Sequence, residues 1–439
     1  MIQAVRNAFT LPDLRRKLLF TLAILIIYRL AAHVPVPGVN QAALKNLLQG
    51  GGAGGQLVGL LDILSGGAVA TFSVMAMGVY PYITASIIFQ LLVPIIPNLE
   101  QMLKEEGEEG RRRLERYTYY LTVPLAALQA IGQVRLFGSI GGEPILPHFG
   151  FSGPQLLPTF ATIAAMTAGT MFAIWLGELI SEQGIGNGVS LIIFGGIVAR
   201  IPQNVVNILV QQGVGGLLLF LAITAITVFV IVVVQEGQRR IPVQYGKRVR
   251  GRRVYGGQAT HIPLRVNTAG MIPLIFAQSI LTFPAIIAQF FITSTNPTVA
   301  SFARSVTNIF SGTSGWYAPM YFLMVVAFTY FYTDVLVQQQ DLPGVLQRQG
   351  GFIPGIRPGR RTAEYITAVY RRITLVGALF LGAVAVLPFI VGLFVRSPQG
   401  TPTLLITSAG LLIVVGVVVD TMRQLEAQLL MRHYESFLR

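Results

Sequence analysis

The chain contains no cysteine among its 439 residues, and only 11% of those residues are charged. The missing thiols exclude disulfide bonds and thiolate metal sites. Soluble domains carry about 25% charged residues, so the low charge content argues against a soluble protein. Apolar residues instead make up 53% of the chain, and the mean hydropathy is +0.64. This composition predicts a protein that crosses a membrane several times.

Catalytic and nucleotide-binding patterns are also missing from the sequence. The four histidines share no metal-ligand spacing, and there is no nucleophile elbow and no phosphate-binding loop. The glycine-rich stretch 184–188 precedes an apolar run and lacks the strand that a dinucleotide fingerprint requires, so we interpret it as a tight turn. We therefore expect neither an enzyme nor a cofactor nor a metal site.

Apolar stretches of transmembrane length recur along the whole chain. The hydrocarbon layer of a bilayer needs about 20 mostly apolar residues in a helix. Arg29 interrupts the end of the first stretch and no cleavage pattern follows, so we interpret that stretch as an anchor rather than a signal peptide. The expected fold is an all-α integral membrane protein with ten transmembrane helices. The ten stretches are residues 18–32, 72–96, 118–137, 156–180, 187–209, 214–235, 268–291, 317–338, 373–395 and 403–420.

Lysine and arginine are distributed unevenly between the connecting segments. Segments 1–17, 98–117, 236–267, 339–372 and 421–439 hold 26 of the 32 Lys and Arg residues, and the segments on the opposite side hold 6. Connecting loops rich in these residues stay in the cytoplasm. The distribution predicts a multi-pass topology with both termini cytoplasmic.

The positive charge exceeds what topology alone requires. Loops 236–267 and 339–372 carry 14 Lys or Arg residues, and 28 of the 32 basic residues in the chain are arginine. Arginine is suited to bidentate contacts with phosphate and carboxylate groups. The pattern predicts a docking surface for a large anionic partner, and ribosomal RNA and an acidic motor or targeting protein fit it equally well. The residues in the first loop that we expect to dock the partner are Arg239, Arg240, Lys247, Arg248, Arg250, Arg252 and Arg253.

A short apolar segment at 57–68 cannot span a bilayer. Glycines flank it on both sides and can act as hinges. Non-helical backbone at membrane depth is tolerated only inside protein or beside a water-filled cavity. We interpret the segment as a movable insert, with an exterior loop carrying a surface helix as the alternative. Its residues of interest are Leu57, Leu60, Leu61, Ile63, Leu64, Gly66 and Gly67.

Spans two and seven share a glycine, a proline, an isoleucine and an alanine at the same spacing, offset by 192 residues. Four matching positions are a weak signal alone. The two spans nevertheless cross in opposite directions, which is typical of inverted repeats with a functional path between halves. The expected halves are residues 1–210 and 211–439. The matching residues are Gly78, Pro81, Ile83 and Ala85, and Gly270, Pro273, Ile275 and Ala277.

A secondary transporter is the main alternative that the hydropathy pattern leaves open, and an intramembrane enzyme is a third class. Ion-coupled transport needs charged groups near the bilayer midplane. Glu178, Asp334 and Asp420 lie near the cytoplasmic ends of their spans, where we expect water to solvate them. Small polar residues in spans two and seven could bond helix to helix, at about 0.6 kcal/mol each. A passive channel therefore fits better than a transporter.

Three strings closely resemble the bacterial SecY family, the channel subunit of the general protein translocase (SecYEG). The resemblance covers essentially the full length. It implies two inverted five-helix halves, hinged around a central hourglass pore. The strings are Ser65-Gly-Gly-Ala leading into Gly78-Val-Tyr-Pro81-Tyr-Ile83-Thr-Ala-Ser86-Ile-Ile, then Glu182-Gln-Gly-Ile-Gly-Asn187-Gly, then Gly351-Phe-Ile-Pro354-Gly-Ile-Arg357-Pro-Gly.

The resemblance implies three moving or sealing parts. A ring of aliphatic side chains closes the waist, segment 57–68 is the plug, and spans two and seven form a lateral gate. Two ring positions hold valine where the family favours isoleucine, so we expect a slightly wider ring. The pore ring is Val79, Ile83, Val189, Ile193, Ile275 and Ile413. The gate residues are Thr84, Ser86, Ile87, Gln90, Gln278, Ser279 and Thr282.

The resemblance also implies function and partners. We expect a protein-conducting channel in the cell inner (plasma) membrane that passes unfolded secretory polypeptides across it and signal sequences and membrane helices into the lipid. Energy comes from outside, from the SecA motor or the ribosome, and SecE and SecG are the implied partner subunits. In the second basic loop, Arg357 is the residue that we expect to matter most for docking, with Arg360 and Arg361 beside it.

Overall fold

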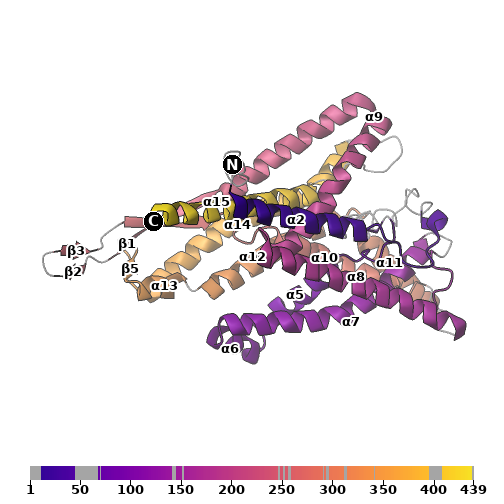
Figure 1. The fold of residues 1–439 in the computed structure, drawn as a ribbon, viewed down its shortest axis with the longest axis horizontal. Helices are drawn as coiled ribbons and strands as arrows, with labels where there is room; N and C mark the ends of the chain where they lie inside the picture. The colour runs from indigo at the N-terminus through magenta and orange to yellow at the C-terminus, as the bar shows by residue number, and fades with distance from the viewer. Residues whose placement is uncertain are drawn as a thin grey trace.

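The computed structural model describes residues 11–44, 68–69, 71–140, 145–150, 153–245, 248–250, 253–255, 259–289, 291–292, 296–310, 314–340, 342–394 and 408–437. Helices dominate these residues, as the hydropathy predicts (Figure 1). They are α2 (Pro12–Ala31), α5 (Tyr80–Leu92), α6 (Pro97–Glu105), α7 (Glu108–Ile140), η1 (Gly153–Gln155), α8 (Leu156–Gln183), α9 (Gly188–Glu236), α10 (Ile272–Gln289), α11 (Pro297–Phe310), α12 (Tyr317–Gln340), α13 (Leu342–Arg348), α14 (Arg360–Phe394) and α15 (Ser408–Phe437).

Five helices within the described ranges are long and apolar enough to cross a membrane. A bent pair, Tyr80–Leu92 with Pro97–Leu103, turns by 100° and raises the number to six if it counts as one span. This establishes a multi-pass membrane protein, while ten spans stay a prediction. The five helices are Gly153–Gln183, Gly188–Val210, Gly213–Glu236, Tyr317–Arg348 and Arg360–Leu387.

Helix α9 contains two of the expected spans, one on each side of a break in its backbone. Its backbone breaks at Gly213, where φ is 68° and ψ is −169°. Glycine adopts this conformation readily because it has no Cβ to clash with the backbone. The break falls between the expected spans 187–209 and 214–235. The second segment exposes large apolar side chains such as Leu218 (62%) and Phe229 (68%), as a helix against lipid does.

Several predicted boundaries were wrong. The expected span 72–96 is helical only from Tyr80, because the preceding residues fold into turns in which the Val74 N–H donates to the Val34 carbonyl at 2.9 Å. Helix α14 begins well before the expected span 373–395, and α15 continues well beyond residue 420. Hydropathy marks only the part of a helix that lies in lipid, whereas arginine and glutamate extend the same helix into water.

The two basic loops contain β-strands, so the expectation of an all-α fold was wrong in this part of the chain. The fold remains predominantly helical, but β4-β1-β5 form an antiparallel sheet and β2 pairs with β3. Along β1, Ile241 and Val243 are buried and Pro242 between them is exposed, the alternation of a strand with one buried face. The strands are β1 (Gln238–Tyr245), β2 (Arg248–Arg250), β3 (Arg253–Tyr255), β4 (Ala259–Arg265) and β5 (Gly351–Phe352).

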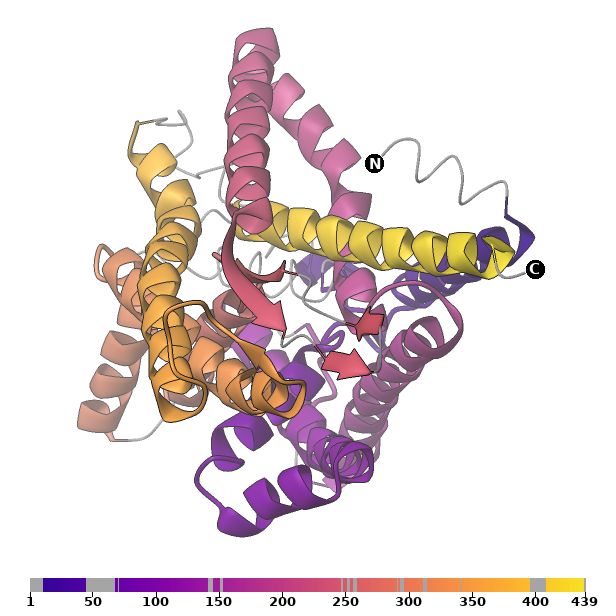
Figure 2. The same ribbon diagram turned by 90° about the vertical axis from the view of Figure 1, so that its left-hand side faces the viewer.

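The connecting elements separate to opposite ends of the molecule. Strands β1, β2, β3 and β5, helices α6 and α13 and the C-terminal end of α15 gather at one end, and α11 lies toward the other (Figure 1). Figure 2 looks onto the first end, with the strands toward the viewer and the helices behind them. These elements belong to the segments rich in Lys and Arg.

The largest hydrophobic cluster lies between the two expected halves. It combines buried residues from α2, α8 and the first part of α9 with residues from α10, α12, α14 and α15. A second cluster packs around Phe72 and Phe137 within the first half, and a third lies under the sheet. The two halves therefore share one apolar core.

Candidate functional site

The six pore-ring residues lie in the same hydrophobic cluster. Ile193, Ile275 and Ile413 are buried, at 4%, 7% and 3% exposure. Val79 is also buried, and Ile83 and Val189 are partly buried against the same cluster. Val79 directly precedes α5 and the other five lie on α5, α9, α10 and α15, so the set draws on both expected halves of the chain. Aliphatic side chains from both expected halves therefore belong to one hydrophobic cluster, and their convergence into a ring stays a prediction.

Two glycines start the ring helices in the same way. Gly78 (φ 52°) precedes the first residue of α5 by two positions, and Gly270 (φ 65°) precedes the first residue of α10 by two. A positive φ costs glycine little. The proline of each repeat then sits near the helix start, where its missing N–H is no loss. The shared spacing therefore corresponds to a shared backbone conformation, which places Ile83 and Ile275 at matching helical positions.

The α8–α9 turn positions Val189 and Ile193. The Asn187 side chain caps α9 by accepting a hydrogen bond from the Ser190 N–H at 3.0 Å. The Gly188 N–H donates to the Ser181 hydroxyl at 2.9 Å. A Cβ at Gly188 would lie 1.7 Å from the carbonyl oxygen of Gly177, so only glycine fits. Interpreting this glycine-rich stretch as a tight turn is therefore correct.

Helices α5 and α10 face each other with their own neighbours beside them. Helix α5 packs on α7, α10 packs on α12, and α10 also contacts α5 and α7. The Tyr80 hydroxyl donates to the Ser279 carbonyl at 3.4 Å, which links the two helices directly. The seam between the halves therefore has a long, weak hydrogen bond across it.

The expected gate residues bond mostly within their own half. Thr84 donates to the Tyr80 carbonyl at 3.0 Å, and the Gln90 amide donates to Ser86 at 3.1 Å. Buried oxygens of Gln90 and Ser279 have no hydrogen-bond partner among the described residues. Ile87 is buried on α5, and Gln278 and Thr282 lie on α10. A buried polar atom without a partner destabilises the packing around it, so these two oxygens weaken the contact between α5 and α10.

A polar cluster near the docking end was missed from the sequence. The Tyr119 hydroxyl on α7 donates to the Glu178 carboxylate on α8, and it also lies 3.5 Å from Glu115. Tyr82 of α5 stacks on Tyr119, with ring centroids 5.6 Å apart. Partial burial and the nearby Glu178 raise the pKa of the Glu115 carboxyl above its usual range. The sequence suggested that water solvates Glu178. In the structure Glu178 is instead half-buried and hydrogen-bonded.

The plug residues lie outside the described residues. These are Leu57, Leu60, Leu61, Ile63, Leu64, Gly66 and Gly67. Ala68, which follows them, is fully buried in the same cluster as the pore ring. The C-terminal end of segment 57–68 therefore reaches the central core.

The two basic loops form one surface. Strand β5 of the second loop pairs with β1 of the first, with Gln244 opposite Phe352 and Tyr245 opposite Gly351. The side chains of Arg239, Arg240, Arg357, Arg360 and Arg361 are exposed on it. Arg248, Arg250 and Arg253 lie on β2 and β3, while Lys247 and Arg252 lie outside the described residues.

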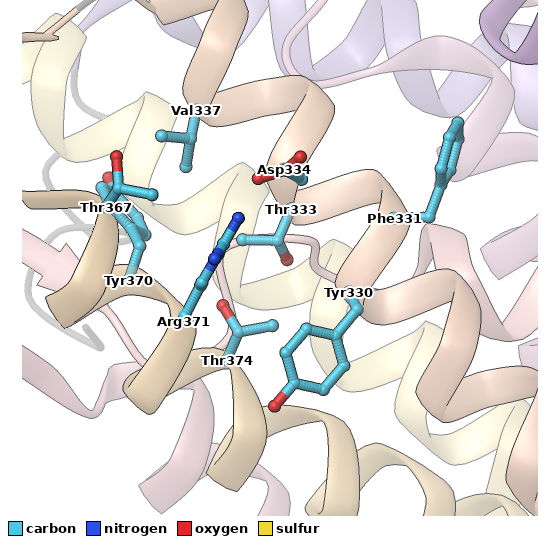
Figure 3. Close-up of a pocket in the computed structure, with 9 residues that line it drawn as sticks. All are labelled: Tyr330, Phe331, Thr333, Asp334, Val337, Thr367, Tyr370, Arg371 and Thr374. Atoms are coloured by element: carbon cyan, nitrogen blue, oxygen red, sulfur yellow. The ribbon is translucent and has the colours of Figure 1, made fainter. Parts of the chain in front are cut away.

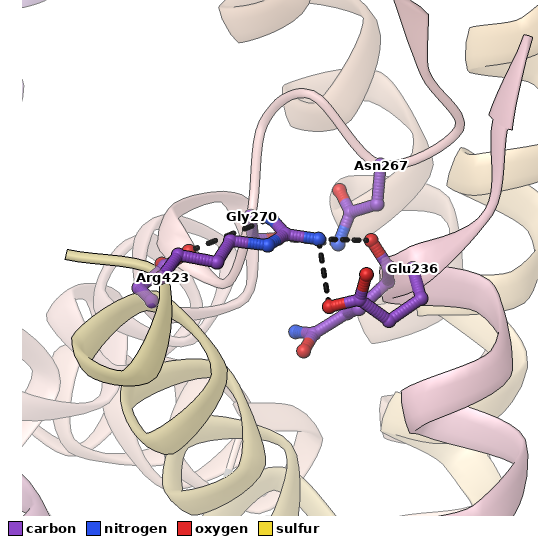
Figure 4. Close-up of polar contacts among 6 residues, drawn as sticks. Glu236, Asn267, Gly270 and Arg423 are labelled. Atoms are coloured by element: carbon purple, nitrogen blue, oxygen red, sulfur yellow. Dashed lines mark hydrogen bonds and ion pairs between the residues drawn. The ribbon is translucent and has the colours of Figure 1, made fainter. Parts of the chain in front are cut away.

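An ion pair fixes the base of this surface. Arg423 of α15 donates to the Glu236 carboxylate at 2.9 Å and to the Gln235 carbonyl at 3.2 Å (Figure 4). The Asn267 amide donates to the Gly270 carbonyl at 3.1 Å, which closes the connection from β4 to α10. The partners are 187 residues apart in the chain, so no local pattern could have indicated the pair.

The site has an apolar centre and a cationic end. Among the described residues, no group of His, Cys, Asp or Glu side chains could hold a metal ion. An apolar constriction can exclude water and ions, and it makes no specific hydrogen bonds with a passing chain. Arginine side chains at one end can bind phosphate or carboxylate groups. The arrangement suits binding and passage of a large molecule.

The fold and site define a multi-pass, predominantly helical membrane protein whose halves meet at an apolar centre. A sequence model of the SecY family matches residues 73–422, and the protein translocase subunit SecY of Streptomyces galbus is 43% identical over 100% of both chains. The chain belongs to the SecY family, whose members are channel subunits and not enzymes.

Solved channels share the fold. A SecY structure concerned with the plug domain and the closed state aligns at a TM-score of 0.58 and 18% identity, covering 94% of this chain and 91% of that chain. A Sec61 channel from a canine ribosome–channel complex of the endoplasmic reticulum aligns at a TM-score of 0.53 and 18% identity, covering 93% and 92%. At these identities the likeness concerns the fold.

Proposed function

We propose that the chain is the protein-conducting channel subunit of a Sec translocase. It passes unfolded secretory polypeptides across the plasma membrane and membrane helices sideways into the lipid. The observation that supports this proposal is that six aliphatic side chains, drawn from both expected halves, belong to one hydrophobic cluster. Family membership agrees with it.

The pore ring acts as a seal that does not depend on the sequence of the passing chain. At rest, its uncharged side chains exclude water and so raise a barrier to ions. When a polypeptide enters, the same side chains can move apart without breaking hydrogen bonds. The two valines, Val79 and Val189, make the ring slightly wider than six isoleucines would. This suits a substrate whose sequence is arbitrary.

The plug and the lateral gate complete the channel. Segment 57–68 blocks the exterior funnel at rest, and its flanking glycines let it move. Opening between α5 and α10 lets a signal sequence reach lipid. The long Tyr80–Ser279 hydrogen bond and the unpartnered buried oxygens of Gln90 and Ser279 support a seam that can separate.

The cationic surface docks the partner that supplies energy. Its strands and exposed arginines present a rigid, positively charged face suited to ribosomal RNA or to the SecA motor. Arg357 lies five residues after the end of β5, and its carbonyl accepts a hydrogen bond from Thr362 at 3.0 Å, so the exposed side chain extends from a bonded turn. SecE and SecG are the partner subunits that family membership suggests.

The proposed topology is ten spans with both termini cytoplasmic, in the cell inner membrane. The clustering of arginine-rich connections at one end of the molecule supports this orientation. The proposed halves are residues 1–210 and 211–439, arranged around an hourglass pore. The matched conformations of Gly78 and Gly270 support an inverted repeat.

Removing the ring side chains tests the proposal. Glycine at Ile83, Ile193, Ile275 and Ile413 should raise ion conductance through the resting channel in planar bilayers, because the apolar constriction is lost. Matched controls are glycine at Ile201, Ile287 and Val418, which lie on α9, α10 and α15 but are exposed at 40%, 42% and 43%. Unchanged conductance in the ring variant, or an equal leak in the control, would count against the assignment.

A further inference from the structure

A cavity of about 290 Å³ lies between α12 and α14, toward the end of the molecule that carries the basic loops. It takes no part in the proposed ring, plug or gate. Two charged side chains of opposite sign border it, one from each helix, together with several hydroxyl groups. Its lining residues are Tyr330, Phe331, Thr333, Asp334, Val337, Thr367, Tyr370, Arg371 and Thr374.

The charged groups stand at the rim and the hydroxyl groups lie deeper. Asp334 and Arg371 are exposed, while Thr333 and Thr374 are 4% and 5% exposed. In Figure 3 the guanidinium of Arg371 points from α14 toward the α12 segment that carries Thr333 and Asp334. The cavity therefore offers a cation, an anion and hydroxyl groups to one ligand.

The cavity opens beside surfaces that face lipid. On α14, the residues that follow Arg371 expose large apolar side chains: Leu375 (47%), Val376 (61%) and Leu379 (47%). On α12, Leu323 (64%) precedes Asp334 by eleven residues, or roughly 16 Å at 1.5 Å per residue. The helices run in opposite directions, so both apolar surfaces extend from the charged rim the same way, into the bilayer.

We propose that this cavity binds the headgroup of an aminophospholipid, phosphatidylethanolamine, with its acyl chains along the exposed faces of α12 and α14. The Arg371 guanidinium binds the phosphate, and the Asp334 carboxylate binds the primary ammonium group. Small-molecule pockets are typically about 300–1,000 Å³, so a cavity of about 290 Å³ holds a headgroup and not the chains. The proposal rests on the membrane location of these helices.

The charge balance of the rim selects the lipid. A purely anionic headgroup would meet the Asp334 carboxylate, which repels it. A choline headgroup carries no N–H, so it cannot donate a hydrogen bond to Asp334. An ethanolamine headgroup pairs with both charges. Since the rim is exposed to water, each ion pair is worth no more than about 1 kcal/mol, or about fivefold in affinity.

The test uses the full chain with its partner subunits in nanodiscs that contain photoreactive phosphatidylethanolamine. Mass spectrometry of the crosslinked peptides should place the lipid on residues 323–337 and 367–379. Unlabelled phosphatidylethanolamine should compete about fivefold better than phosphatidylcholine or phosphatidylglycerol with the same acyl chains. Soluble glycerophosphoethanolamine should not compete, because it lacks the chains.

Substitutions at Asp334 and Arg371 test the roles of the two charged side chains separately. Asp334→Asn should abolish the preference for ethanolamine over choline, and Asp334→Glu should retain it. Arg371→Gln should weaken competition by phosphatidylethanolamine and by phosphatidylcholine, because both carry the phosphate. Arg372→Gln is the matched control, since Arg372 is exposed but does not line the cavity, and it should change nothing. A uniform loss in every variant, including this control, would contradict the assignment.

Four results would overturn the proposal. Equal or better competition by phosphatidylglycerol would indicate an anionic-lipid site. Displacement by glycerophosphoethanolamine would indicate a soluble ligand. An unchanged ethanolamine preference in Asp334→Asn would remove the role of the carboxylate. Crosslinks to α12 and α14 that appear only when the partner subunits are left out would mean that a protein segment covers the cavity.

Discussion

At the scale of single residues, the environment of a side chain decides its role more than its type does. Glu178 looked like a solvated charge near a helix end, yet it accepts a hydrogen bond from Tyr119 and lies near a second carboxylate. Asp334, in a similar position along its span, is exposed. Hydropathy cannot distinguish these two acids, because the difference comes from the neighbouring helix.

The carboxylate pair predicts a pH-dependent stability. The ionised Glu115 carboxylate is poorly solvated and repelled by Glu178, and both effects raise its pKa. Glu115→Gln should therefore raise the thermal unfolding midpoint at pH 8 by roughly 1 °C. Lowering the pH through the raised pKa protonates the wild-type carboxyl and removes the cost, so the difference should shrink. Differential scanning fluorimetry across pH 5–8 measures both.

The control for that experiment is Glu108→Gln, on the same helix. The Glu108 side chain is 87% exposed and lies 3.9 Å from Arg111. Its replacement should change the unfolding midpoint at pH 8 by less than Glu115→Gln does. A Glu115→Gln effect that grows as the pH falls would have the wrong sign and would contradict repulsion by Glu178.

At the scale of elements, short connections carry much of the specificity. The α8–α9 turn, the α5 and α10 starts and the β1–β5 pairing each depend on one or two backbone contacts. The apolar helices themselves need only length and hydropathy to form in a membrane. The connections decide which face of each helix points toward the ring.

The α8–α9 turn gives a sharp prediction. Alanine at Gly188 would place its Cβ 1.7 Å from the Gly177 carbonyl oxygen, so the turn must shift. We expect Gly188→Ala to lower the free energy of unfolding by about 1–3 kcal/mol and to loosen the ring. Thermal unfolding in detergent and the resting conductance in bilayers measure the two effects.

Gly215→Ala on the same helix is the matched control. A Cβ at Gly215 meets nothing within 4 Å, and alanine favours a helix over glycine. Stability should stay the same or rise slightly. If Gly188→Ala were as stable and as tight as Gly215→Ala, the close approach would not matter for the channel.

At the scale of the whole molecule, two bundles share one core and one weak seam. The largest hydrophobic cluster joins the two expected halves through apolar contacts, which have no preferred direction. Across the seam, the Tyr80–Ser279 hydrogen bond is long, at 3.4 Å. The proposed lateral gate would open along this seam.

Removing that hydrogen bond should shift the seam toward opening. Tyr80→Phe deletes the hydroxyl and keeps the ring, and a typical hydrogen bond contributes about 0.5–1.5 kcal/mol. We expect the open population to rise by about twofold to tenfold. Because the chain has no cysteine, spin labels at Leu128→Cys on α7 and Ile287→Cys on α10 can report the distance by pulsed EPR.

Tyr120→Phe, on α7, is the control because it removes a tyrosine hydroxyl that is not part of this hydrogen bond. Tyr120 is 72% exposed, so its replacement should leave the distance distribution unchanged. Identical distributions for Tyr80→Phe and wild type would show that the hydrogen bond does not hold the seam.

The sequence by itself determined the membrane class and the family, because hydropathy, arginine placement and short glycine motifs are local signals. Only the tertiary structure decided that two basic loops form one sheet, that Tyr119 bonds Glu178, that Arg423 pairs with Glu236, and that Asp334 and Arg371 border one cavity. These contacts join residues far apart in the chain. Helices of similar hydropathy can pack in many orders, and only the packed arrangement specifies which side chains meet.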